Sequence, residues 1–284
     1  MKTALTLALL LAVPAAAQQT TEVSLRQVSD RRAKEFFSEL TLTLELPKIQ
    51  SKEVVASRAF VKSATDDTGS DLVDPEESNP EFEGNPRAMS ADGPPAPALV
   101  SVKLLNPPRK AKTIAAVSGE IELFMPGRDP NSIAEIAKFT TMGGKALAHK
   151  ALKANGVEIT MLTTEQIEAE RNARIEKKKK EYAEAGYEGE NLEDAVRSAA
   201  EYILPVEEGE LLARIRDPQQ RLREITWVDA AGEVSTVIAR DDEGLVTLSS
   251  WGGAPQSDWT MRVSMKTEKN VVRYAFALKD VPLP

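Results

Sequence analysis

The chain has 284 residues, 42% of them hydrophobic and 28% charged, with no cysteine and a single histidine. This composition fits an ordinary globular protein of one or two domains. The lack of cysteine excludes thiol catalysis, thiolate metal sites and disulfides. Without the leader described next, 35 basic residues stand against 44 acidic ones, a net charge of −9 that disfavours nucleic acid and anionic membranes as partners.

The first residues of the chain predict an export signal. Lys2 supplies a positive charge, residues 4–13 are apolar, and Pro14-Ala15-Ala16-Ala17 place small residues before a cleavage site. The apolar run is shorter than the roughly 20 residues that a bilayer-spanning helix needs. We therefore expect a signal peptide over residues 1–17, export to the periplasm or the extracellular space, and no transmembrane segment in the mature chain.

Apolar and polar residues alternate along much of the first half, which is the pattern of half-buried antiparallel strands. Residues 98–126 are predicted to form a strand pair joined by a rigid Asn106-Pro107-Pro108-Arg109 corner. The pattern predicts a first β-sandwich domain over residues 18–154, with strands over 21–28, 40–46, 54–62, 98–104, 120–125, 133–139 and 145–153.

Residues 66–97 interrupt this pattern with many carboxylates, few apolar residues and a Pro-rich end, which predicts a long exposed loop. Hard oxygen ligands suit Ca²⁺, and the candidate ligands are Asp66, Asp67, Asp71 and Asp74. The glycine of this segment does not stand where an EF-hand loop requires it. A solvated acidic loop without metal is the favoured alternative.

The second half is predicted to be another β-sandwich, over residues 155–284, with a helical-hairpin insertion at 164–203. The insertion is rich in Glu, Lys, Ala and Arg and contains no proline. Strands separated by turn signals follow over residues 210–215, 222–229, 233–240, 245–250, 259–265 and 272–278. The predicted fold class is mainly β, with two tandem antiparallel immunoglobulin-like sandwiches.

Few side chains point to specific chemistry. His149 is the single histidine, so a His-ligated zinc site of the usual kind is excluded, and its neighbours do not mark it as a catalytic base. Trp251 stands in a Ser- and Gly-rich loop and is the candidate for stacking on a ligand. The run Lys177–Lys180 is flanked by glutamates and predicts a solvated helix face. Phosphate-binding loops and nucleophile elbows are absent from the sequence.

Four stretches, at residues 66–72, 105–114, 119–123 and 276–284, resemble uncharacterised exported bacterial proteins with tandem immunoglobulin-like β-sandwich domains. The resemblance implies a β-sandwich fold and export. It implies no activity and no catalytic residues.

We therefore expect an exported, non-catalytic binding or structural module, without catalytic or cofactor-binding residues. Its partner would be a protein, a glycan or an envelope component, bound through loops or sheet edges. The alternatives are a polysaccharide-acting hydrolase that uses paired carboxylates and a calcium-stabilised adhesion module.

Overall fold

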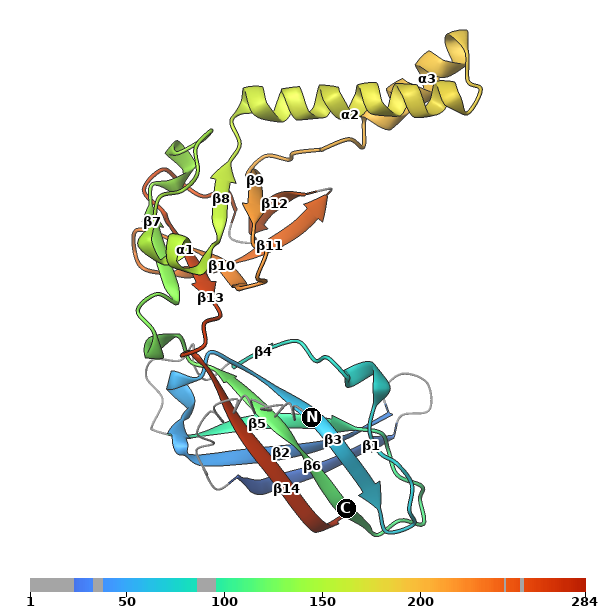
Figure 1. Cartoon of the computed structure of the whole chain (residues 1–284), viewed down its shortest axis with the longest axis vertical. Coiled ribbons are helices and arrows are strands. Elements are labelled where there is room, and N and C mark those ends of the chain that lie inside the picture. Colours follow the sequence, from blue (N-terminus) through green and yellow to red (C-terminus); the bar gives the residue numbers. More distant parts are fainter. Residues whose placement is uncertain (1–22, 33–37, 86–95, 243, 251–252) are drawn as a thin grey trace, which may run out of the picture. The chain divides into compact units, whose positions relative to one another are not determined.

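The computed structural model describes residues 23–32, 38–85, 96–242, 244–250 and 253–284. It is mainly β, and every strand pair is antiparallel (Figure 1). The chain divides into two compact units, residues 1–125 with 271–284, and residues 126–270. Among the described residues, no helix combines the length and the apolar character that a membrane crossing requires.

The first unit contains two sheets. One has the order β1-β2-β5, with β1 Ser24–Arg32, β2 Ser38–Gln50 and β5 Pro97–Leu104. The other has the order β14-β6-β3-β4, with β14 Val271–Pro282, β6 Thr113–Phe124, β3 Ala56–Asp66 and β4 Glu83–Gly84. The two sheets face each other across a single hydrophobic core (Figure 1).

This core follows directly from the alternation in the sequence. The inward face of β2 carries four fully buried leucines, which pack with residues of β6 and β14 such as Ile121 and Tyr274. Burying a leucine side chain contributes roughly 1.5–3 kcal/mol, so this one face is a large part of the driving force. The leucines are Leu40, Leu42, Leu44 and Leu46.

The second unit is built on one seven-stranded sheet of order β7-β13-β10-β11-β12-β9-β8. Residues from both edge strands, Ile136 of β7 and Ile159 of β8, belong to the same core, in which Trp227 stacks on Phe139. The sheet therefore curls around this core. Its strands are β7 Ile133–Ala137, β8 Glu158–Met161, β9 Leu211–Arg216, β10 Leu222–Val228, β11 Val234–Asp242, β12 Leu245–Ser250 and β13 Thr260–Met265.

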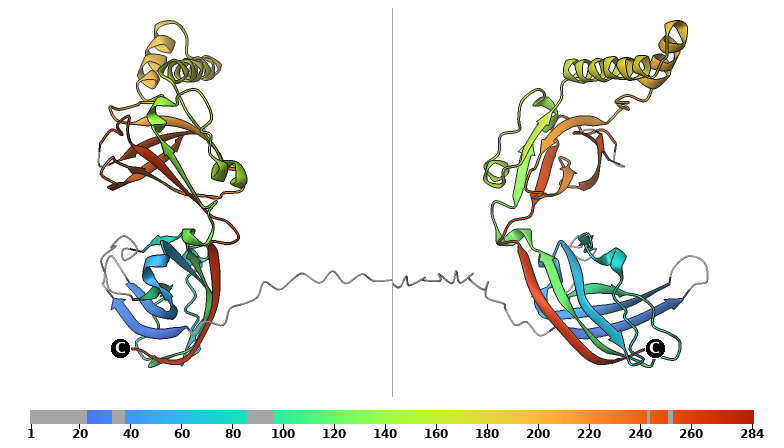
Figure 2. Two further views of the ribbon diagram at one scale, coloured as in Figure 1. Left: turned by 90° about the vertical axis from the view of Figure 1, so that its left-hand side faces the viewer. Right: turned by 45° about the vertical axis from the view of Figure 1, so that its right-hand side comes forward.

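Two helices, α2 Thr164–Glu184 and α3 Gly189–Ala200, connect β8 to β9, which pair with each other. Helix α2 starts with a capping box in which Thr163 and Gln166 bond each other's backbone. Neither helix contains a buried residue. Both extend away from the strands of their unit (Figures 1 and 2).

The division of the chain differs from the predicted boundary at 154/155. Strand β14 pairs with β6 along its length, from Val271 opposite Phe124 to Pro282 opposite Thr113, so the last strand belongs to the first unit. The second unit is therefore connected between two neighbouring strands of the first. Alternation identifies a strand but not its partner, which is why the sequence suggested two units in tandem.

Two local predictions are wrong. Residues 145–153 do not form a strand: helix α1 Lys150–Asn155 begins where the Nδ1 of His149 accepts the backbone N–H of Ala151, and Gly156 ends it with a positive φ of 67°. Strands β5 and β6 do not pair with each other, because they lie in different sheets. The Pro107-Pro108 corner carries the chain from one sheet to the other.

Candidate functional site

The acidic segment after β3 is ordered by its own aspartates. The buried Oδ1 of Asp66 accepts the Thr68 N–H at 2.8 Å, the Thr68 hydroxyl at 2.8 Å and the Ser70 N–H at 2.9 Å. Asp71 accepts the Val73 N–H, and Asp74 caps the 3-10 turn Pro75–Glu77 through the Glu76 N–H. Aspartates favour such turns because their short side chains reach the backbone two residues ahead.

Asp66 is the most specialised of these carboxylates, at 2% exposure. Burial raises its pKa, but the hydrogen bonds donated by Ser70 and Thr68 outweigh that effect and hold the pKa below its usual value. Among the described residues its Oδ2 has no hydrogen-bond partner. Asp66 therefore stays ionised and organises the start of the segment.

The four candidate calcium ligands are not brought together. Asp67 accepts the backbone N–H of Lys112 with both oxygens, at 3.1 Å each, while Asp66, Asp71 and Asp74 bond their own local turns. Within the described part of the chain, no group of three or more acidic or histidine side chains is arranged to hold a metal ion.

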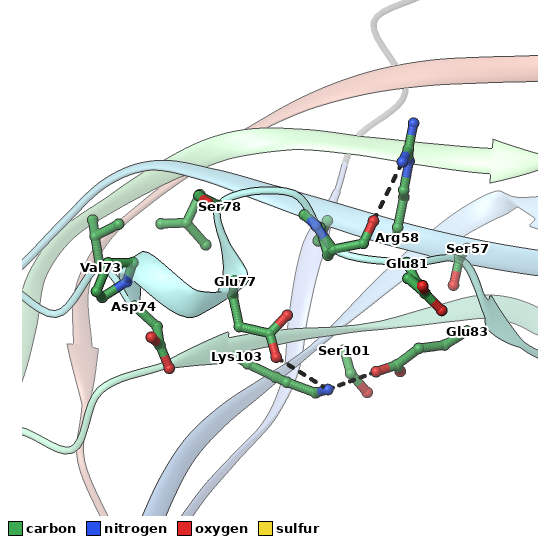
Figure 3. Close-up of a pocket in the computed structure, with 14 residues that line it drawn as sticks. Ser57, Arg58, Val73, Asp74, Glu77, Ser78, Glu81, Glu83, Ser101 and Lys103 are labelled. Carbon is green, nitrogen blue, oxygen red and sulfur yellow. Dashed lines mark hydrogen bonds and ion pairs between the residues drawn. The ribbon is translucent and has the colours of Figure 1, made fainter. Parts of the chain in front are cut away.

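The segment covers a groove on the open side of the first unit, between β3 and the edge strand β5 (Figure 3). We call it the edge groove. Its volume is about 160 Å³, close to what a benzene-sized group fills. Its apolar lining includes Ala59, Val61 and Val73, which pack against the core of the unit. The carboxylates that line it are Asp74, Glu77, Glu81 and Glu83.

Lys103 of β5 ties the acidic segment to the sheet. Its Nζ lies 2.7 Å from Glu83 Oε1 and 3.5 Å from Glu77 Oε1 (Figure 3). The hydrogen bond to Glu83, opposed by partial burial and assisted by the charges of both glutamates, raises the pKa of Lys103. The lysine charge is thus neutralised inside the groove.

Arg58 of β3 is also engaged. Its Nη2 lies 2.6 Å from Oε2 of the buried Glu122, and its Nη1 donates to the Pro80 carbonyl at 3.3 Å. Its guanidinium stacks over Phe60 and Phe82, at 4.7 and 4.5 Å from the ring centroids. Because both basic residues of the lining are paired, the groove presents a net negative surface.

The edge groove lies beside a stretch of β3 whose outer edge pairs with no strand among the described residues. Strand β3 pairs with β4 only at Ala56 and Ser57, and its far end bonds the segment again from Ala64 onward. Between these points, in the part of the chain that the structure describes, this edge of β3 has no backbone partner. Strand β5 is likewise the last strand of its sheet.

The other residues singled out from the sequence lie elsewhere or in structural roles. Trp251 lies outside the described residues. His149 caps α1, and Lys177–Lys180 form an exposed stretch of α2. Sequence reasoning missed Lys103 and Arg58. Each stands on the polar side of a predicted strand, but nothing in the sequence identifies the glutamates that they bind.

Comparison of the chain with protein-family models, with curated proteins and with solved structures finds no match.

Proposed function

We propose that the protein is an exported, non-catalytic binding module of the bacterial envelope or extracellular space, built on an immunoglobulin-like sandwich. The strand orders β1-β2-β5 and β14-β6-β3-β4 correspond to the A-B-E and G-F-C-C′ orders of such sandwiches. In this correspondence the second unit is inserted between strands F and G. The F–G loop belongs to the end with which variable domains bind their antigens.

The ligand that best suits the edge groove is an extended, cationic polypeptide segment. The observation that carries this proposal is the edge of β3 between Ser57 and Ala64, which has no backbone partner among the residues that the structure describes and lies directly at the groove. An extended segment adds to such an edge through backbone hydrogen bonds, and alternate side chains fill pockets beside it. Here one small apolar side chain would enter the groove, and basic neighbours would meet Glu81 and Asp74.

Binding suits the groove better than hydrolysis of a polysaccharide. A two-carboxylate glycosidase needs one carboxyl group that is protonated before reaction. Two carboxylates of the groove, Glu77 and Glu83, share the ammonium group of Lys103, which is the arrangement of a structural ion pair. The calcium-stabilised alternative lacks an assembled ligand set among the described residues.

The peptide proposal is tested by fluorescence anisotropy with the chain from Gln18 onward. We expect a labelled Lys-Val repeat peptide to bind and a Glu-Val repeat peptide not to bind. Glu81→Gln should weaken binding up to about fivefold, because exposed charge pairs contribute about 0.2–1 kcal/mol. The matched control is Glu193→Gln, an exposed glutamate on α3. Equal binding of both peptides would disprove the proposal.

Export is tested separately. We expect a bacterial host that expresses the full chain to accumulate it outside the cytoplasm, with Gln18 as its first residue by N-terminal sequencing. A cytoplasmic product that retains Met1 would contradict export and leave the groove proposal unaffected.

A further inference from the structure

The second unit contains a larger hollow beside α1, of about 740 Å³, which we call the α1 pocket. Pockets for small molecules typically have volumes of about 300–1,000 Å³. The pocket is formed by the chain entering α1, by α1 itself, by the start of β8 and by the turn after β9. Its apolar lining residues are Ala146, Leu147, Ala148, Leu152, Val157 and Pro218.

Basic side chains surround this apolar lining. Lys150, Lys153 and Arg216 line the pocket together with a single carboxylate, Glu158. Among the residues that the structure describes, none of these three cations has an ion-pair partner. The concentration of unpaired positive charge stands out in a chain of formal net charge −8.

The walls of the pocket are fixed by the fold. The backbone N–H of Leu147 donates to the Ile159 carbonyl, so the entering chain lies along β8, whose other side pairs with β9. Ala151 and Leu152 anchor α1 in the core of the unit. The buried Asn155 donates to the Asn131 carbonyl at 2.8 Å. A rigid pocket loses little conformational entropy when a ligand enters.

His149 adds a polar group to the lining. Its Nδ1 accepts the Ala151 N–H at 3.1 Å, which leaves Nε2 as the N–H donor of the ring. The α1 pocket thus combines an apolar lining with three cations and an N–H donor. An anion that also carries apolar surface would match both the lining and the polar groups.

We propose that the α1 pocket binds an amphiphilic carboxylate, with its chain on the apolar lining and its head group among Lys150, Lys153 and Arg216. Burial of the chain supplies affinity, about fourfold for each methylene group that leaves water. The cations supply the preference for a negative head group. The α1 pocket belongs to the second unit and the edge groove to the first. The ligand proposed for the α1 pocket is an anion, whereas the ligand proposed for the edge groove is cationic.

The proposal is tested by titration calorimetry of the chain from Gln18 onward with octanoate, decanoate and dodecanoate, each below its micelle concentration. We expect the dissociation constant to fall about 15-fold with each added pair of methylene groups that leaves water. Decanol should bind more weakly than decanoate, and decyltrimethylammonium should not bind. Equal binding of decanoate and decyltrimethylammonium, or no binding of any carboxylate, would overturn the proposal.

Two variants test whether the ligand binds in the α1 pocket. The double variant Lys153→Gln/Arg216→Gln should weaken decanoate binding about tenfold, whereas Lys179→Gln/Lys180→Gln on α2 should leave it unchanged. Ala148→Trp fills the pocket from an exposed position, so it should abolish binding without unfolding the unit. Thermal melts verify that each variant is folded. Full decanoate affinity in folded Ala148→Trp would show that the ligand binds elsewhere.

Discussion

Glu122 shows how one buried charge organises the outer face of a sheet. It lies on β6 between two arginines of the neighbouring strands, with Arg58 Nη2 at 2.6 Å and Arg273 Nε at 2.8 Å. Cross-strand register places both arginines directly opposite it. A buried carboxylate is tolerated when ion pairs or hydrogen bonds compensate for its lost hydration, and for Glu122 the two arginines do so.

We predict that Glu122→Gln lowers the free energy of unfolding by about 3 kcal/mol, because it leaves the partly buried Arg58 without its counter-charge. Urea unfolding measures the change. The control is Glu120→Gln, whose ion pairs with Lys62 and Arg273 are longer, at 3.8 and 3.6 Å, and more exposed. That control should change stability by less than about 1 kcal/mol. Equal losses of stability in the two variants would show that the burial of Glu122 does not add to the cost of removing its charge.

Asp66 should make stability depend on pH. Its pKa is lower in the folded state than in the unfolded chain, so its contribution is complete well above the unfolded pKa of about 3.9 and is lost as the pH falls through the folded value. Asp66→Asn keeps an acceptor oxygen but removes the titration. We therefore expect this variant to be less stable than the parent at pH 7 and the difference to narrow below about pH 4.

Urea unfolding at a series of pH values measures this difference. Asp258→Asn, at an exposed position, is the matched control and should change the free energy of unfolding at pH 7 by less than about 0.5 kcal/mol. If the difference in the free energy of unfolding between the parent and Asp66→Asn stayed constant from pH 7 to pH 3, the role assigned to the Asp66 charge would be contradicted.

At the scale of single elements, strand β6 depends on a glycine at a bulge. The register between β3 and β6 shifts between Val61 and Ser63, next to Gly119. A Cβ on Gly119 would lie 2.1 Å from the Phe60 carbonyl oxygen and 2.7 Å from the Phe276 ring. The bulge and the ring leave no room for a side chain.

We predict that Gly119→Ala destabilises the first unit by about 1–3 kcal/mol, the usual cost of overpacking. Gly84→Ala is the control, because a Cβ there meets no atom within 4 Å and its effect should stay within about 0.5 kcal/mol. Thermal and urea unfolding compare the two variants. A neutral Gly119→Ala would mean that β3 and Phe276 move aside easily.

The presence of a strand can be predicted from the sequence because the alternation of apolar and polar residues is a local pattern. The pairing of strands cannot be predicted in this way, because it depends on residues far apart in the chain. The alternation over residues 40–46 and 98–104 correctly marks the buried faces of β2 and β5. The wrong strand at 145–153 shows the limit of this approach. Its apolar residues also fit one helical turn, and the cap at His149 with Gly156 decides between the two.

The candidate site illustrates the same limit. Composition identifies the acidic segment, but it does not show that carboxylates such as those of Asp71 and Asp74 accept hydrogen bonds from nearby backbone. The edge groove depends on contacts of Lys103 of β5 with Glu77 of the 3-10 turn and Glu83 of β4, which no local pattern encodes. The α1 pocket depends on the β8–β9 pairing in the same way.

At the scale of the whole molecule, each unit has its own hydrophobic core. The core of the first unit contains residues up to Met125 and from Tyr274 onward, and the cores of the second lie entirely within residues 126–270. The chain leaves the first unit after β6 and returns at β14, where Phe124 and Val271 are paired partners. The points at which the chain leaves and re-enters the first unit are therefore next to each other on paired strands.

This geometry predicts that the first unit folds without the second. Joining Met125 to Val271 through a short Asn-Gly-containing linker converts β6 and β14 into an ordinary hairpin, because antiparallel partners need only a few linking residues. The resulting chain of about 120 residues keeps the complete core and has the size of an independent domain. We expect a single cooperative unfolding transition and dispersed amide NMR signals.

Residues 126–270 expressed alone serve as the matched comparison and should also fold, since they retain the whole curled sheet. The two fragments would then separate the binding activities: the Lys-Val peptide should bind the shortened first unit and decanoate the isolated second unit. If the linked first unit instead showed no cooperative unfolding transition, the correct pairing of β14 with β6 would depend on the second unit. The inserted unit would then be part of the folding mechanism of the first unit.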